Sequence, residues 1–209
     1  MSVFPEPAVA WHRPDDPSRP LVVLLHGRGA DEFSIIGLAD TFPDGASYAA
    51  VRAPIAEGGG YAWFANRGIG RPIGESLSQT MAWFGAWLDG VAQPGRDVVL
   101  IGFSGGAAFA GGLLLSDPQQ YAGAAILYGT LPFDAGIGVT AGLLTGVPVF
   151  VAQGEEDVVI PRELLDSTWN YLTGESGAQT EAHRYRGGHA LTPTGSAALG
   201  AWLNARLHP

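Results

Sequence analysis

In Val98-Val99-Leu100-Ile101-Gly102-Phe103-Ser104-Gly105-Gly106, a continuous apolar run leads into a serine that is set between glycines. The small residues at 107–110 follow directly and predict a buried helix. A strand, a sharp turn at a serine and a helix form a nucleophile elbow, Gly-x-Ser-x-Gly. With 31 glycines in the chain, the pattern gains its meaning from its position between a strand and a helix. Ser104 is therefore the predicted nucleophile.

Strand-like and helix-like segments alternate along the chain. The run at 20–25 is apolar throughout, which is typical of a strand buried on both faces. The expected strands are 20–25, 47–52, 97–101, 124–128, 147–152 and 180–185, and the expected helices are 31–41, 75–91, 105–116, 161–172 and 194–207. We predict an α/β fold with a mostly parallel central sheet, helices on both faces, no cap domain and one domain over residues 1–209.

Composition limits the chemistry that the chain can perform. A net charge of −9 argues against nucleic acid and anionic membranes as partners. The chain has no cysteine and no lysine, which removes thiol nucleophiles, Cys-ligated metals, the P-loop lysine and Schiff-base chemistry. We expect neither a metal nor a cofactor. The N-terminus shows no signal-peptide pattern and no apolar run is long enough to span a bilayer, so we expect a cytoplasmic protein.

Three polar residues follow predicted strand ends, where functional groups gather in parallel sheets. They are Ser104, Asp157 and His189, and they occur in the chain order of the α/β-hydrolase triad. A serine hydroxyl is a poor nucleophile at neutral pH, so a histidine must accept its proton during attack. An aspartate then fixes the imidazole tautomer and stabilises the imidazolium. These residue types in this order predict acyl transfer through Ser104.

Other residues compete for the acid and base roles. Glu155 and Glu156 adjoin Asp157, but the segment 158–161 leads back into a helix and leaves Asp157 on the loop. The remaining histidines are His12, His26, His183 and His208. Two of these lie near the termini and His183 lies inside a strand. His26 follows a strand end, but its place in His26-Gly27 suggests that it holds the loop.

The same loop predicts part of an oxyanion hole. Hydrolysis of an ester needs two donors aimed at the developing oxyanion, usually backbone N–H groups. We predict the amides of Gly105, directly after the nucleophile, and of Arg28, in the loop after the early strand. Gly27-Arg28-Gly29 also begins a dinucleotide-binding pattern, but the third glycine is replaced by Glu32, which would repel a pyrophosphate.

Several independent segments together resemble the phospholipase/carboxylesterase family of small α/β-hydrolases, which includes acyl-protein thioesterases. The segments are Leu25–Glu32, Gly58–Phe64, the elbow, Gly154–Pro161 and Gly187–His189. The resemblance implies a serine hydrolase that acts on carboxylic esters or thioesters, with Ser104, Asp157 and His189 as the triad. Eukaryotic thioesterases of the family carry Gln after the serine. Gly105 stands there in this chain, which is closer to the bacterial carboxylesterase branch.

Substrate size and partners are expectations from loop composition. The loop 53–74 carries Tyr61, Trp63 and Phe64, which we expect to line a pocket for a short-acyl or aryl ester, although packing in an ordered loop is an equal alternative. A catalytically silent binding module, or acyl transfer and perhydrolysis by the same triad, are alternative functions. A homodimer through Trp83 and Trp87 is a further alternative, with core packing the simpler interpretation.

Overall fold

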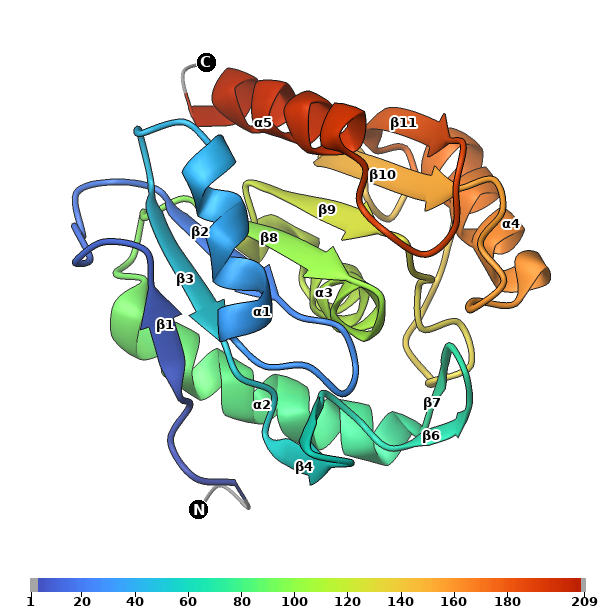
Figure 1. Ribbon diagram of the computed structural model, residues 1–209, viewed down its shortest axis with the longest axis horizontal. Coiled ribbons are helices and arrows are strands. Elements are labelled where there is room, and N and C mark those ends of the chain that lie inside the picture. Colours follow the sequence, from blue (N-terminus) through green and yellow to red (C-terminus); the bar gives the residue numbers. More distant parts are fainter. Residues whose placement is uncertain (1–3, 208–209) are drawn as a thin grey trace.

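The computed structural model describes residues 4–207, and its centre is a seven-stranded sheet in the order β1-β3-β2-β8-β9-β10-β11 (Figure 1). The strands are β1 (Val9–Trp11), β2 (Leu21–Leu25), β3 (Ser47–Val51), β8 (Val98–Phe103), β9 (Gly123–Leu127), β10 (Pro148–Gly154) and β11 (Gln179–Tyr185). β1 pairs antiparallel with β3, and every other neighbouring pair in this sheet is parallel. The mostly parallel sheet is confirmed, and β1 is an additional edge strand.

Helices cover both faces of the sheet (Figure 1). One face carries α2 (Gly74–Val91), α3 (Gly105–Ser116) and α4 (Arg162–Asn170), and the other carries α1 (Phe33–Ile36) and α5 (Pro193–Leu207). Successive side chains of a strand point to opposite faces. In β2, Leu21, Val23 and Leu25 therefore join the core under α2 and α3, whereas Val22 and Leu24 join the core under α1 and α5. Burial of all five explains the unbroken apolar run.

The segment expected as a long loop at 53–74 contains two small hairpins. The first pairs β4 (Ile55–Glu57) with β5 (Gly60–Ala62), and the second pairs β6 (Asn66–Gly68) with β7 (Arg71–Pro72). The first hairpin is also hydrogen-bonded to the loop after β2. Gly29 N–H donates to Tyr61 O at 2.8 Å, and Tyr61 N–H donates to Ala30 O at 3.0 Å. A methyl group at Gly60 would lie 2.0 Å from Gly29 O, so this close approach requires glycine.

Two expected helices are shorter or less regular than the sequence suggested. The 31–41 segment forms α1 followed by a 3₁₀ turn, η1 (Gly37–Thr41), and Gly37 at the junction is a poor helix former. The 161–172 segment forms α4 and then a π turn, η3 (Tyr171–Glu175). A further 3₁₀ turn, η2 (Pro118–Gln120), follows α3. Within residues 4–207, no helix has both the length and the apolar character that a membrane crossing requires.

Trp83 packs in the interior of the chain. Only 5 % of its surface is exposed, and its indole N–H donates to Pro5 O at 2.6 Å. The Trp87 ring lies 5.4 Å from the Phe84 ring of the same helix. The packing supports the core interpretation of these tryptophans, and a homodimer stays a hypothesis.

Candidate active site

Ser104 lies on a strained turn between β8 and α3. Its backbone has a φ of 55° and a ψ of −115°, a positive-φ conformation that residues other than glycine rarely adopt. A methyl group at Gly102 would lie 2.2 Å from Gly106 O, and one at Gly106 would lie 2.1 Å from Leu25 O. Both glycines are therefore required by close backbone contacts. Such strain is typical of functional sites, where the surrounding structure holds it.

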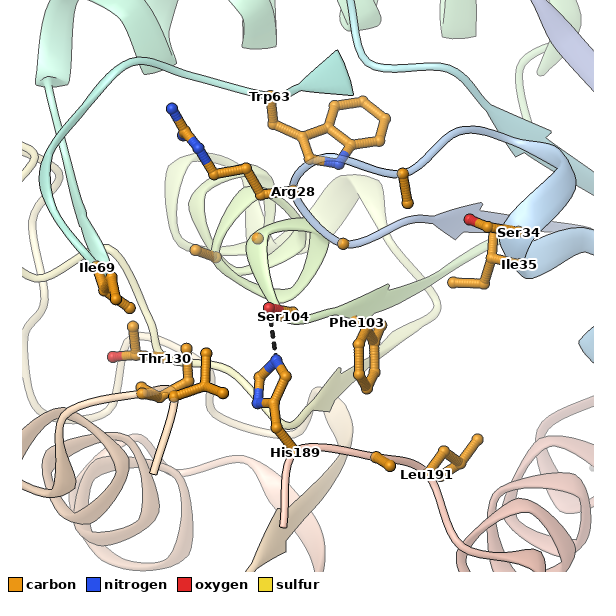
Figure 2. A pocket seen from close by; sticks show the side chains of 18 of the residues that line it. Arg28, Ser34, Ile35, Trp63, Ile69, Phe103, Ser104, Thr130, His189 and Leu191 are labelled. Atoms are coloured by element: carbon orange, nitrogen blue, oxygen red, sulfur yellow. Dashed lines mark hydrogen bonds between the residues drawn. The ribbon is translucent and has the colours of Figure 1, made fainter. Parts of the chain in front are cut away.

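The structure brings the three predicted triad residues together. Figure 2 shows the contact between Ser104 and His189. His189 Nε2 lies 2.8 Å from Ser104 Oγ, and His189 Nδ1 lies 2.7 Å from Asp157 Oδ2. An ionised carboxylate only accepts hydrogen bonds, so Nδ1 carries the hydrogen. Nε2 then presents its lone pair to the serine hydroxyl. This tautomer is the one that general-base catalysis requires.

Asp157 is held rigidly by the loop that follows β10. Its side chain is fully buried, whereas that of His189 is 16 % exposed. Asp157 Oδ1 accepts hydrogen bonds from the amides of Val159 at 2.9 Å and Ile160 at 3.2 Å. A buried carboxylate needs such donors to offset its loss of water. The aspartate is thus oriented before any ligand binds.

The competing residues are placed elsewhere. Glu155 and Glu156 are exposed. His183 lies 2.9 Å from a carboxylate oxygen of Glu181 and stacks on Tyr185 with ring centroids 5.6 Å apart. His12 faces Asp40. The fifth histidine, His208, lies outside the described residues.

His26 holds the loop after β2, as its sequence position suggests. It is fully buried, its Nδ1 lies 2.7 Å from Gly27 O, and its Nε2 accepts the Ala53 amide at 3.0 Å. Since Nε2 accepts, Nδ1 must carry the hydrogen. The indole N–H of Trp63 donates to His26 O at 2.8 Å. Burial lowers the pKa of His26, while the Gly27 carbonyl and the nearby carboxylates offset only part of that effect.

The two predicted oxyanion donors lie next to each other beside Ser104. A methyl group built on Gly105 would lie 3.2 Å from Arg28 N, and both residues line the cavity that contains Ser104. Gly105 begins α3, so its amide has no acceptor within the helix. The Arg28 side chain turns away: Nε donates to Glu57 at 2.6 Å and Nη1 donates to Phe64 O at 2.8 Å (Figure 2). The arrangement leaves two backbone amides beside the serine.

Glu32 braces the same loop. Its buried carboxylate accepts two hydrogen bonds from Arg52, from Nε at 2.7 Å and from Nη2 at 2.6 Å. Paired bonds of this kind fix orientation as well as distance. The residue that departs from the dinucleotide-binding pattern therefore joins the oxyanion loop to the segment that follows β3.

Ser104 opens into a cavity of about 650 Å³. Trp63 and Phe64 line it, as expected, and Trp63 is stacked on Phe109 with ring centroids 4.4 Å apart. Tyr61 does not line it. Its ring lies under the guanidinium of Arg52, 4.7 Å away, so the expectation that Tyr61 forms part of the pocket is wrong. The cation draws the tyrosine toward the core side of the loop.

Most of the remaining residues of the cavity wall were not predicted from the sequence. The additional apolar and polar residues are Ile35, Leu38, Asn66, Ile69, Phe103, Thr130, Val159, Ile160 and Leu191. Val159 is 42 % exposed although it is apolar. The apolar run directly after Asp157 was the one available hint, because exposed apolar residues beside a predicted catalytic loop suggest a binding surface.

Two aromatic rings support the His189 imidazole. The Phe103 ring lies 5.2 Å from it and the Tyr128 ring lies 6.5 Å from it, edge to face. Tyr128 is fully buried and has a φ of 48°, the second positive-φ residue other than glycine in the described chain. Burial raises the pKa of the Tyr128 hydroxyl.

Among residues 4–207, no group of three or more His, Asp or Glu side chains is arranged to hold a metal ion.

Several known proteins are similar to this chain in sequence and in fold. A model of the phospholipase/carboxylesterase family matches residues 7–206. The putative hydrolase MhqD of Bacillus subtilis (strain 168) is 27% identical over 177 residues, which is 82% of this chain and 86% of the relative. The Bacillus cereus carboxylesterase has a TM-score of 0.83 at 25% identity, covering 96% of this chain and 94% of that one. A carboxylesterase from Mesorhizobium loti has a TM-score of 0.78 at 25% identity, covering 89% and 88%.

The family match spans nearly all of the described residues, and the similar structures share the sheet and its helices. The predicted α/β-hydrolase fold is confirmed. The chain belongs to the phospholipase/carboxylesterase family and is a hydrolase of that type.

Proposed function

We propose that the protein hydrolyses carboxylic esters through an acyl-enzyme on Ser104. The observation that carries this proposal is the position of His189, 2.8 Å from the serine oxygen and 2.7 Å from the Asp157 carboxylate. Family membership and the similarity to two bacterial carboxylesterases support the reaction class. Thioesters require the same steps and fall within the proposal.

In the first half-reaction, Ser104 Oγ attacks the ester carbonyl carbon while His189 Nε2 takes its proton. The carbonyl oxygen gains the negative charge and receives hydrogen bonds from the Arg28 and Gly105 amides. The C–O bond to the alcohol then breaks as the tetrahedral intermediate collapses. His189 returns the proton to the departing alkoxide, so the alcohol leaves neutral and the acyl group stays on Ser104.

In the second half-reaction, water replaces the alcohol. His189 takes one proton from the water as its oxygen attacks the acyl carbon, and the same two amides bind the oxyanion. Collapse breaks the bond to Ser104 Oγ, which regains the proton from His189, and the carboxylic acid leaves. Asp157 keeps its charge throughout and stabilises the imidazolium. No other chemical group is required for these steps.

The cavity supports small esters as substrates. Its volume of about 650 Å³ is that of a site for a small organic molecule. Its walls are largely aliphatic and aromatic, and they include Trp63 and Phe64. We therefore assign short-acyl or aryl esters to this protein. A preference for long-chain lipid over short p-nitrophenyl esters would contradict this assignment.

Ser104→Ala tests the nucleophile. We expect the variant to lose fluorophosphonate labelling and to lose esterase activity by about 10⁴-fold or more, with an unchanged unfolding temperature. Ser34→Ala is the matched control, because Ser34 also lines the cavity but its hydroxyl donates to Asp31 O. Labelling must persist in this control. Labelling that also persists in Ser104→Ala would remove Ser104 as the nucleophile.

Pre-steady-state kinetics separates the alternative functions. A burst of p-nitrophenol equal to the enzyme concentration shows an acyl-enzyme. A protein that binds p-nitrophenyl esters but releases no p-nitrophenol, in a burst or in the steady state, would instead be a binding module. Analysis of the acyl product in the presence of alcohols or hydrogen peroxide then distinguishes hydrolysis from acyl transfer and perhydrolysis, because these reactions differ in the acceptor alone.

A further inference from the structure

The loop after β2, residues 26–32, is attached at both of its ends to the segment that follows β3. At its start, the Ala53 amide donates to His26 Nε2 at 3.0 Å. At its end, the Glu32 carboxylate accepts hydrogen bonds from Nε and Nη2 of Arg52, at 2.7 Å and 2.6 Å. The two attachments come from consecutive residues, so the loop is anchored to the end of a single strand.

Tyr61 attaches the middle of the same loop. Gly29 N–H donates to Tyr61 O at 2.8 Å, and Tyr61 N–H donates to Ala30 O at 3.0 Å. The tyrosine ring lies 4.7 Å from the guanidinium carbon of Arg52, and its hydroxyl accepts a hydrogen bond from Arg52 Nη1 at 3.3 Å. Arg52 thus holds the loop directly through Glu32 and indirectly through Tyr61. We refer to these three residues as the Arg52 cluster.

The ion pair in this cluster supplies orientation more than stability. The Glu32 side chain is buried and that of Arg52 is partly exposed. Removal of a carboxylate from water is costly, and well-packed apolar residues of similar volume often give equal or greater stability. Two parallel N–H···O bonds fix an orientation that apolar contacts do not. The pair therefore suits a part of the chain whose position must be held closely.

The Arg28 amide is such a part of the chain, because it is the proposed oxyanion donor of this loop. A donor of this kind acts only when its N–H points at the developing oxyanion from about 2.7–3.1 Å. A displacement of about 1 Å at a reacting centre can lower a rate by about 10²-fold. A methyl group built on Gly105 would lie 3.2 Å from Arg28 N. A small shift of the loop would therefore change the spacing of the two donors.

We propose that the Arg52 cluster positions the Arg28 amide for the oxyanion. The inference rests on the proposed ester hydrolysis and adds three positioning residues to it. None of the three lines the cavity, so they act through the loop and do not touch the substrate. An oxyanion is present in the transition state and absent from the bound ester. Loss of the cluster should therefore lower kcat and leave KM nearly unchanged.

Glu32→Gln tests the cluster at constant side-chain size. The glutamine oxygen still accepts one hydrogen bond, but its N–H₂ group faces a second donor of Arg52. We expect kcat for 4-nitrophenyl butanoate to fall by about 3- to 30-fold, a fraction of the effect of losing a whole donor. KM should stay within about twofold of wild type. Both half-reactions form an oxyanion, so kcat falls whichever of them is slower.

A trifluoromethyl ketone inhibitor provides a second measurement. Its carbonyl carbon adds to Ser104 Oγ, and the resulting oxyanion lies between the same two amides. Its Ki should rise in Glu32→Gln by the same factor by which kcat/KM falls, because both report the binding of an oxyanion. A residue that only stabilised the fold would not connect these two quantities.

The double variant Glu32→Leu/Arg52→Met separates orientation from stability. It leaves neither charge of the pair unpaired and keeps the approximate side-chain volumes, so we expect an unfolding temperature close to that of the wild type. The two parallel hydrogen bonds are absent. We therefore expect kcat to remain as low as in Glu32→Gln or lower, although stability has returned.

Asp15→Asn is the matched control. Asp15 accepts two hydrogen bonds from the buried guanidinium of Arg96, at 2.6 Å and 3.2 Å, so this pair resembles the Glu32–Arg52 pair. Arg96 precedes β8 and Ser104 follows it, which places the control pair at the opposite edge of the sheet. The control should unfold at a lower temperature and keep the wild-type kcat, KM and Ki.

An unchanged kcat in Glu32→Gln, or a wild-type kcat in the double variant, would overturn the proposal. A rise in KM without a fall in kcat would also overturn it, since the cluster would then shape the binding of the ester. So would a loss of activity in Asp15→Asn equal to that in Glu32→Gln, which would follow from lowered stability alone. A wild type that does not hydrolyse 4-nitrophenyl butanoate, or a Ser104→Ala variant that still does, would instead contradict the proposed function.

Discussion

His26 and His189 lie at the same edge of the sheet but have opposite surroundings. His26 is fully buried, and both of its ring nitrogens are engaged by backbone groups, Gly27 O and the Ala53 amide. His189 is partly exposed, and its Nε2 faces a hydroxyl at the floor of an open cavity. A histidine can act as a base when a partner fixes one ring nitrogen and the other nitrogen is free to accept a proton from the reacting group. When the backbone takes both nitrogens, the ring is a structural brace.

The largest expected effect is on activity and comes from His189. His189→Ala removes the group that accepts the serine proton, so we expect kcat/KM for a p-nitrophenyl ester to fall by about 10⁴-fold or more. The unfolding temperature should change little, because the side chain lies at the cavity surface. Esterase assays and thermal denaturation of the same preparation provide the two measurements. Retention of most of the activity would remove His189 from the proposed mechanism.

For His26 we expect the opposite result, a large effect on stability and a small effect on activity. His26→Ala leaves the Ala53 amide and the Gly27 carbonyl without their partners and opens space beside Trp63. We expect the free energy of unfolding to fall by about 3 kcal/mol. Chemical denaturation measures this loss. Activity per folded molecule should fall far less than in His189→Ala, and a reversed order of the two effects would contradict the comparison.

Much of this architecture could be predicted because it depends on local regularities. Unbroken apolar runs mark strands buried on both faces, and polar residues directly after them identified Ser104, Asp157 and His189. β1 was missed because Val9–Trp11 is only three residues long and gains its structure by pairing with β3. Tyr61 was misassigned because its direction depends on Arg52, which belongs to a different part of the sequence.

The cavity walls were the least predictable part of the site. Ile35, Asn66 and Leu191 come from three separate segments, and each has an unremarkable local sequence. Their shared position arises from tertiary packing alone.

The pH dependence of stability offers a finer test of the His26 environment. Burial lowers the pKa of His26 below its ordinary value of 6.5, so the unfolded chain takes up the proton first as the pH falls. Above pH 6.5, the ordinary pKa, the neutral His26 ring makes its full contribution to the free energy of unfolding. It is lost as the pH falls from there toward the folded-state pKa, with a slope of at most about 1.4 kcal/mol per pH unit.

His26→Gln is the matched variant for this measurement, because glutamine has both a donor and an acceptor but does not titrate. Denaturant unfolding of wild type and variant between pH 5 and pH 8 isolates the contribution of the histidine from that of other groups. The difference in stability between the two proteins should shrink as the pH falls. A constant difference over this range would show that His26 titrates alike in the folded and unfolded states.

The smallest expected effect concerns Arg28, whose amide is the proposed oxyanion donor and whose side chain reaches Glu57 and Phe64 O. Arg28→Met keeps the amide and the aliphatic stem but releases this anchor. Both partners of the ion pair are partly exposed, at 32% and 43%, so we expect a loss of stability below about 1 kcal/mol.

The oxyanion forms only as the reaction proceeds, so a less firmly held amide should lower kcat, by about tenfold or less, and leave KM nearly unchanged. Glu57→Gln should produce a smaller change in the same direction because the amide oxygen still accepts a hydrogen bond. A loss of activity in Arg28→Met as large as that in His189→Ala would mean that the guanidinium itself contacts the reacting atoms. The Arg28 side chain would then be part of the catalytic site and not only an anchor for the loop after β2.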